Sequence, residues 1–166
     1  MSQTTHFCGA ILYRTPLDSS DVEFLVIEYL HRGRCAIKFA GGTNSECPEE
    51  APLATLVREI AEELGIILSR SADHVFEIPK GPDHIQYWFV YDHEVEGTYT
   101  HTLRTIPMRD GDEELSPPRW IKASELVREG GPDQIFHSHL IPLRKAAEII
   151  SQQDRDAAMA LMCVTA

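Results

Sequence analysis

The sequence lacks a long apolar run, an excess of basic residues and a leader-like amino terminus. Its 166 residues include 15 lysines and arginines against 26 aspartates and glutamates, which gives a net charge of −11. Because a protein that binds a nucleic-acid polymer needs a basic face, we expect no such partner. No apolar stretch approaches the roughly 20 residues that cross a bilayer, and no basic segment precedes an apolar one at the amino terminus. We therefore expect no membrane partner and a cytoplasmic location.

Cysteine is also scarce, and its spacing excludes two kinds of site. No C-x-x-C pair occurs, so neither a disulfide framework nor a zinc centre is indicated, and reduced thiols are expected. His137 and His139 are separated by one residue and lack a third ligand, so they are interpreted as a loop pair and not as zinc ligands. The four cysteines are Cys8, Cys35, Cys47 and Cys163.

The length fits one domain, residues 1–166, with a core at roughly 6–150 and a helix-compatible tail at 154–166. The apolar patterns predict strands at 6–14, 23–31, 36–40, 74–79, 84–95 and 118–122, and helices at 53–64 and 140–152. In the last helix we expect Leu143, Ala146, Ala147 and Ile150 to face inward. This order indicates an α/β protein of the α+β type, with a mixed sheet and helices on its faces.

The aromatic run from Tyr87 to Tyr91 is interpreted as part of the core. Strand alternation places Tyr87, Phe89 and Tyr91 on one face, with Trp88 and Val90 on the other. We do not expect any of them to be a platform for a nucleobase.

The helix at 53–64 carries the strongest functional signal. Pro52 suits its first turn, and Gly65 suits the position just after its end, with Ile66 folding back onto the last turn. Glu59, Glu62 and Glu63 lie on one flank near the carboxyl end of the helix. An ordinary solvated acidic face explains this pattern, but the helix dipole disfavours anions there. A bound divalent cation would compensate both the dipole and the mutual repulsion, because hard cations take carboxylate ligands.

The residues around these glutamates extend the pattern. Gly42…Glu50…Arg58-Glu59-Ile60-Ala61-Glu62-Glu63-Leu64-Gly65-Ile66 resembles the Nudix box, G-x5-E-x7-R-E-U-x-E-E-x-G-U, where U is a bulky apolar residue. Every fixed position from Glu50 onward matches, including the seven-residue spacing from Glu50 to Arg58. The loop before it is longer by two residues, and Ala40 stands where the family usually has proline. The resemblance implies a Nudix-like α/β/α sandwich.

The resemblance further implies a hydrolase that cleaves a nucleoside diphosphate linked to another moiety, by attack of water at phosphorus. Mg²⁺ is the implied ion, with Mn²⁺ as the alternative. The implied metal ligands are Glu62, Glu63 and a backbone carbonyl of Gly42 or, less surely, Gly41, and Glu59 is implied either as a further ligand or as an aid to the attacking water. Arg58 and Glu50 match the residues that brace the helix against the loop, although an exposed ion pair explains them nearly as well.

Residues outside the box are assigned more weakly. The family often takes a general base from a later acidic loop, which here is 109–115; Glu113 or Glu114 is preferred over Asp112, and a merely solvated loop fits as well. Substrate phosphates are expected to meet Arg32, Arg34 or Lys38, each of which also fits a solubilising role at a strand edge.

Three functions compete at this point. The first is an Mg²⁺-dependent pyrophosphohydrolase with a small nucleotide-type substrate. The second is a non-catalytic domain of the same fold that senses a ligand or binds a protein. The third is a plain α/β protein with an acidic helix, which predicts no Mg²⁺ binding. The pattern does not identify the substrate, and a homodimer is expected only because dimers are common in the family.

Overall fold

A mixed β-sheet is the middle layer of the protein. The computed structural model describes residues 4–17, 21–126 and 135–165, with side chains described as far as Asp154. The strands are β1 (Thr5–Arg14), β2 (Glu23–His31), β3 (Arg34–Lys38), β4 (Ala40–Thr43), β5 (Ile67–Leu68), β6 (His74–Pro79), β7 (His84–Asp92), β8 (Tyr99–Thr100), β9 (Met108–Asp110), β10 (Glu113–Leu115) and β11 (Arg119–Lys122). The helices are α1 (Pro52–Leu64), α2 (Ala123–Glu125), the 3-10 turn η2 (His137–His139) and α4 (Leu140–Thr165).

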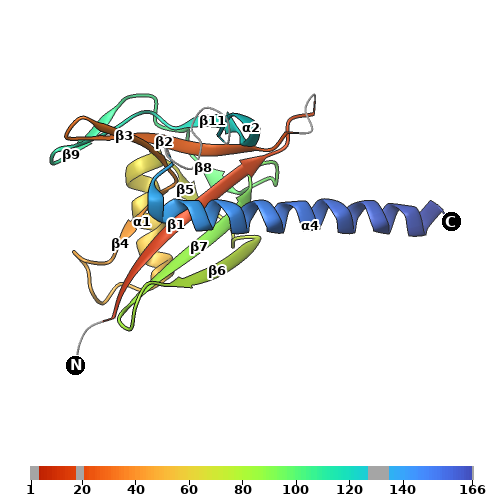
Figure 1. Ribbon diagram of the computed structural model, residues 1–166, viewed down its shortest axis with the longest axis horizontal. Coiled ribbons are helices and arrows are strands. Elements are labelled where there is room, and N and C mark those ends of the chain that lie inside the picture. The colour runs from red at the N-terminus through yellow and green to blue at the C-terminus, as the bar shows by residue number, and fades with distance from the viewer. Residues whose placement is uncertain (1–3, 18–20, 127–134, 166) are drawn as a thin grey trace.

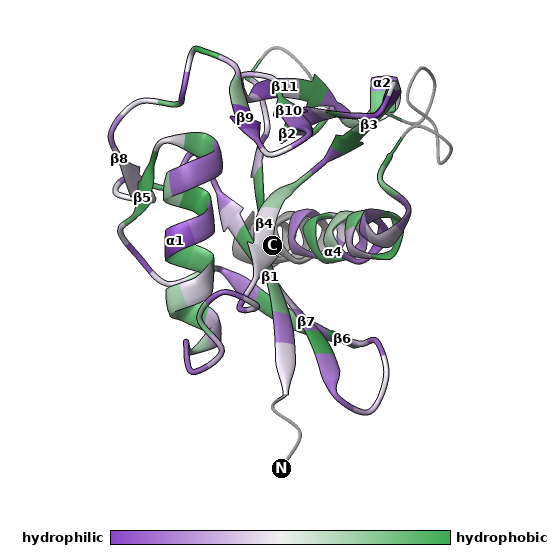
Figure 2. Cartoon of the chain, turned by 90° about the vertical axis from the view of Figure 1, so that its left-hand side faces the viewer, coloured by the Kyte–Doolittle hydropathy of each residue, from purple (hydrophilic) through white to green (hydrophobic). Residues whose placement is uncertain are grey.

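The sheet runs in the order β6-β7-β1-β2-β10-β9, with β4 paired to β1 and both β3 and β11 paired to β2. The β1–β7 pair is parallel and the other pairs are antiparallel, while β5 and β8 form a separate two-stranded ladder. Helix α1 covers one face of the sheet and α4 the other (Figure 2). This arrangement confirms the predicted mixed α+β class.

Two apolar clusters hold the layers together, one under each long helix. Along β7, Trp88 and Val90 belong to the cluster under α4, whereas Phe89 and Tyr91 belong to the cluster under α1. The predicted alternation of this strand is therefore confirmed, and all four side chains are buried.

Several boundaries differ from the prediction. The strand expected at 36–40 is two strands, β3 and β4, divided at Phe39, whose side chain is fully buried. The strand expected at 84–95 ends at Asp92. The acidic segment at 109–115, expected to be a loop, instead contributes to the β9–β10 hairpin. The segment 123–128, to which the pattern assigned no element, begins with the short helix α2 at Ala123–Glu125, and 127–128 lie outside the described residues.

Helix α4 is longer than predicted, since it continues through the tail to Thr165. It crosses the sheet and then projects beyond it (Figure 1). Ala146 and Ile150 are buried as expected and Leu143 is partly buried, but Ala147 is exposed, so its predicted inward position is wrong. Pro142, near the start of the helix, is buried instead. Within the described ranges, no helix is both long and apolar enough to cross a membrane.

Candidate active site

Helix α1 presents the glutamates because its two ends are fixed as the sequence predicts. Pro52 occupies the first turn, and Gly65 ends the helix at φ 76° with its N–H donating to the carbonyl of Ala61 over 3.1 Å. Only a glycine adopts this left-handed conformation at low cost. Ile66, directly after it, is fully buried.

The glycine pair of β4 packs closely against this helix. A Cβ atom on Gly42 would lie 2.2 Å from the carboxyl carbon of Glu59, and one on Gly41 would lie 2.3 Å from the carbonyl oxygen of Cys8. Gly41 also has φ 153°, a conformation that side chains rarely permit. Gly42 therefore allows the close approach of Glu59 on α1, and Gly41 allows the close approach of the neighbouring strand β1.

Glu63 is held from two sides at this junction. It is only 7% exposed. Its Oε2 accepts the backbone N–H of Gly41 over 2.8 Å, and its Oε1 accepts from the ammonium of Lys38 over 2.8 Å. Both oxygens of this buried carboxylate are thus hydrogen-bonded, as burial of a charge requires.

The other two glutamates differ in exposure. Glu59 accepts from Nη1 of Arg58 over 2.6 Å, and burial raises the pKa of its carboxyl, with Glu63 and Glu62 adding to the rise and Arg58 opposing it. The side chain of Glu62 is 55% exposed and lies 3.8 Å from Arg58. Glu62 is therefore the glutamate of the three that is available to solvent at the rim.

Arg58 joins the helix to the preceding loop. Its Nε and Nη2 donate to the two carboxylate oxygens of Glu50 over 3.3 and 3.0 Å, and Nη2 also donates to the carbonyl of Thr43 over 3.2 Å. The Arg58 hydrogen bond is the largest factor that holds the pKa of Glu50 below its usual value. Thr55, which sequence reasoning missed, donates to the same carboxylate over 2.8 Å.

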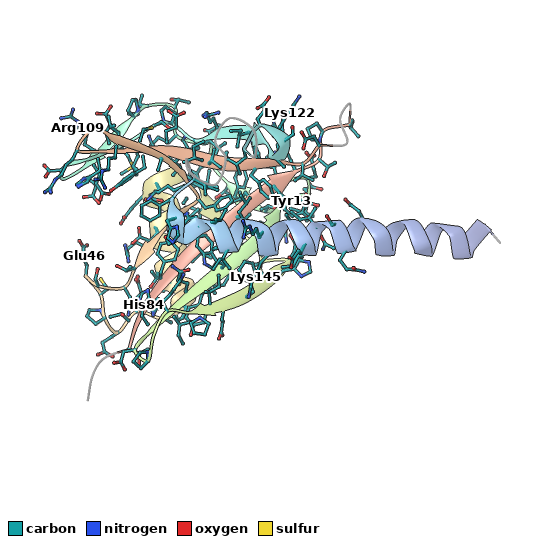
Figure 3. The ribbon with its side chains drawn as sticks, viewed as in Figure 1. Tyr13, Glu46, His84, Arg109, Lys122 and Lys145 are labelled. Carbon is teal, nitrogen blue, oxygen red and sulfur yellow. The ribbon has the colours of Figure 1, made fainter. Side chains whose placement is uncertain are left out.

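These groups surround one cavity of about 400 Å³ between α1, β4 and the β9–β10 hairpin. Its polar lining includes Lys38, Arg58, Glu59, Glu62, Glu63 and Glu113, together with Gly41 and Gly42. Tyr29 and Phe136 add aromatic rings, with their centroids 5.8 Å apart. Asp110 also lines the cavity, although sequence reasoning did not select it. Glu46, in the loop between β4 and α1 and labelled in Figure 3, also lines the cavity.

Three residues predicted for this site lie outside the cavity. Arg32 occupies the β2–β3 turn at φ 48°, exposed and 3.9 Å from Asp112, and Arg34 is exposed beside it. On β10, successive side chains point to opposite faces, so Glu113 reaches the cavity while Glu114 pairs with Arg109 over 3.4 Å. Of the three acids considered as a general base, the structure brings only Glu113 into the cavity.

The negative end of α1 receives a cation that the sequence pattern did not reveal. Arg104 donates through Nε to the carbonyl of Glu63 over 2.9 Å, and its backbone N–H donates to the carbonyl of Leu64 over 2.7 Å. Lys38, Arg58 and Arg104 thus supply much of the charge compensation that the pattern assigned to a bound metal.

The donor set nevertheless fits a hard divalent cation. Carboxylate oxygens and a glycine strand lie along one wall, and protein cations already stand against all three carboxylates, Lys38 against Glu63 and Arg58 against Glu59 and Glu62. In the described part of the chain, no three His, Cys, Asp or Glu side chains stand close enough together to hold a metal ion as they are placed. Binding an ion would therefore require these side chains to turn toward one another.

His139 lines the back of the cavity but, unlike the glutamates, carries no charge. It is 3% exposed, and its Nδ1 accepts the N–H of Phe39 over 3.0 Å. Burial lowers its pKa to about 3, with the charges of Lys38 and Lys80 contributing further. His139 is therefore a neutral histidine of the core.

Comparison with known proteins identifies the family to which the chain belongs. The model of the NUDIX domain matches residues 21–143, which is most of the chain. The chain therefore belongs to the Nudix family, and with it to the hydrolases that act on phosphoric anhydride bonds. No curated protein matches the sequence.

Solved structures show the same fold at low sequence identity. MutT, from a study of the Aliivibrio salmonicida and Vibrio cholerae proteins, superposes with a TM-score of 0.57 at 15% identity, over 89% of this chain and 98% of that one. The NUDIX domain of Shewanella oneidensis NrtR, complexed with ADP ribose, gives 0.60 at 12% identity over 90% of each chain. A NUDIX hydrolase from Nitrosomonas europaea gives 0.59 at 13%, over 88% and 89%.

Proposed function

We propose that the protein is an Mg²⁺-dependent pyrophosphohydrolase that cleaves a nucleoside diphosphate linked to another moiety. The observation that carries this proposal is the convergence of the three box glutamates, Lys38 and Glu113 on one cavity. When bound, the divalent cation would neutralise the pyrophosphate oxygens and assist ionisation of water. Glu59, Glu62, Glu63 and the carbonyl of Gly42 would hold it.

The residues of the chain divide the remaining work. Lys38 is the cavity cation suited to a phosphate oxygen, because its ammonium sits on a flexible stem. Glu113 is the proposed general base. The hydroxyl of Tyr29 donates to Glu113 Oε1 over 3.2 Å and so orients the carboxylate, whose other oxygen can take a proton from the attacking water.

The substrate is proposed to be of the nucleotide type. Phe136 is 40% exposed and stands edge-on to Tyr29 beside the cavity, which gives a nucleobase an aromatic surface for stacking. ADP-ribose is the first compound to test because a domain of the same fold is complexed with it. Nucleotide sugars, dinucleoside polyphosphates and modified nucleoside triphosphates complete the panel.

The test is release of phosphate products from this panel in MgCl₂. Glu62→Gln and Glu63→Gln should each lower kcat/KM by about 100-fold or more, because each removes a metal ligand. Glu77→Gln, on the exposed face of β6, removes the same charge far from the cavity and should leave turnover unchanged. Full turnover by both box variants would overturn the metal assignment. Binding of a panel compound without turnover by the parent would favour a ligand sensor.

A further inference from the structure

Two cations stand against the box carboxylates, and they differ in how firmly they are anchored. Arg58 is tied to Glu50 through two hydrogen bonds and to the carbonyl of Thr43 through a third. Lys38 instead reaches Oε1 of Glu63 from the end of a four-carbon chain that begins on β3. A lysine ammonium is a compact charge that can be re-aimed by rotation about single bonds, whereas a forked guanidinium is fixed by its geometry.

The position of the Lys38 ammonium conflicts with that of a metal ion. It lies 2.8 Å from Oε1 of Glu63, and Oε2 of the same carboxylate is already taken by the N–H of Gly41. A metal ligated by Oε1 would come within a few ångströms of the ammonium. The side chains of Lys38 and Glu63 are only 13% and 10% exposed, so water screens this repulsion poorly. The ammonium and the metal ion therefore compete for one oxygen.

We propose that Lys38 is an exchangeable counter-ion that neutralises Glu63 in the metal-free protein, leaves it when a divalent cation binds, and then pairs with a substrate phosphate. This inference rests on the proposed function and adds a coupling to it. Because the metal ion must displace the ammonium, the protein binds the metal less tightly than it would without Lys38. The displaced ammonium stays within the cavity, and it therefore makes the protein bind an anion more tightly. An anion that accepts the released ammonium therefore strengthens metal binding, and the metal strengthens anion binding by the same factor.

The test compares Lys38→Met, which keeps the length of the side chain without its charge, with Lys122→Met. Lys122 is exposed on β11 and lies on the opposite side of the molecule from the cavity residue Glu46 (Figure 3). Mn²⁺ binding is measured by the electron paramagnetic resonance signal of the free ion, without any anion. Lys38→Met should bind Mn²⁺ about threefold to tenfold more tightly than the parent, and Lys122→Met should match the parent.

The second half of the coupling is measured with methylenebisphosphonate, a non-hydrolysable pyrophosphate analogue, by calorimetry on the Mn²⁺-saturated proteins. Lys38→Met should bind it about tenfold more weakly than the parent, and Lys122→Met should not differ from the parent. Unchanged or weaker Mn²⁺ binding by Lys38→Met would overturn the exchange, as would unchanged affinity for the analogue.

A third measurement leaves Lys38 in place and therefore does not depend on the folding of a variant. The ¹⁵Nζ signal of Lys38 in the parent is identified by its absence from Lys38→Arg. Saturating Mg²⁺ should move this signal to the position of a solvated lysine, and a signal unchanged by Mg²⁺ would overturn the exchange. If the parent hydrolyses the panel but Lys38 does not respond, the exchange alone fails. If the parent binds no Mn²⁺ and hydrolyses nothing, the proposed function itself fails.

Discussion

At the scale of single residues, a chain of hydrogen bonds behind the cavity determines where the box glutamate Glu50 is held. Its carboxylate can only accept, so the hydroxyl of Thr55, 2.8 Å away, must donate to it. The same hydroxyl lies 2.8 Å from Nε2 of His6 and has no second proton to give. The hydrogen must therefore be on Nε2 of His6, which donates to Thr55. His6 and Thr55 are both buried, so this chain is protected from water.

Thr55→Val tests this arrangement. Valine fills the same volume but removes the acceptor of the buried His6 Nε2–H. We expect the free energy of unfolding to fall by about 1–3 kcal/mol, the usual cost of an unpaired buried donor. Urea unfolding at neutral pH measures the change.

His6→Gln is the matched control, because the glutamine amide can place a donor near the position of Nε2. It should lose clearly less stability than Thr55→Val. Equal losses from the two variants would show that burial of the ring at this position, and not its hydrogen bond, stabilises the protein.

At the scale of elements, both ends of α1 were predictable but the cation at its carboxyl end was not. Pro52 and Gly65 are local signals, and a single sequence displays them. Arg104 is 41 residues from Glu63, and Lys38 is 25 residues from it, so the two contacts depend on how the loop after β8 and the strand β3 pack against the helix. The box glutamates are a local pattern that a single sequence displays, while the argument from helix charge assigned to a metal what the protein partly supplies itself.

Arg104→Met tests the capping role. Arg104 donates to the carbonyls of Glu63 and Ser116, over 2.9 and 2.8 Å, and also to the carbonyl of Ile106. Methionine leaves these acceptors without their donor, and we expect the free energy of unfolding to fall by about 2 kcal/mol. Denaturant unfolding measures the loss.

The comparison variant is Arg109→Met. The side chain of Arg109 is 80% exposed and pairs with Glu114 over 3.4 Å, so its loss should change stability by less than about 0.5 kcal/mol. If Arg104→Met and Arg109→Met were equally stable, the hydrogen bonds at the end of α1 would contribute nothing measurable.

At the scale of the whole molecule, the sequence predicted the layers of the fold better than the short strands between them. The strand alternation of β7 and the predicted apolar positions Leu56, Ile60 and Leu64 of α1 identified the faces that meet in the two cores, whereas Leu53, predicted on the same stripe, is exposed. The short strands β5, β8, β9 and β10 were missed, because each has two or three residues and too little pattern to detect. The hairpin of β9 and β10 determines that Glu113, and not Glu114, faces the cavity. Because this hairpin was not predicted, the sequence left the choice between the two glutamates open.

His139, whose side chain packs between η2 and the sheet, is a buried titratable group that should make the free energy of unfolding depend on pH. His139 stacks on Phe39 with the ring planes 10° apart and meets Trp88 edge-on at 4.8 Å. Burial lowers its pKa from 6.5 to about 3, so the unfolded chain binds a proton between these values that the folded protein does not. Stability contributed by the neutral ring is complete above pH 6.5 and falls on acidification, by about 1.4 kcal/mol per pH unit.

His139→Asn removes this titration while its side-chain oxygen can still accept the N–H of Phe39. Between pH 6.5 and about 5, the parent should lose about 2 kcal/mol more stability than the variant, as measured by urea unfolding at each pH. His6, whose pKa burial also lowers, remains in both proteins and accounts for part of the slope that the variant retains. If the free energy of unfolding fell equally with pH in the two proteins, His139 would accept its proton in the folded state, and water would reach the contact between η2 and β7.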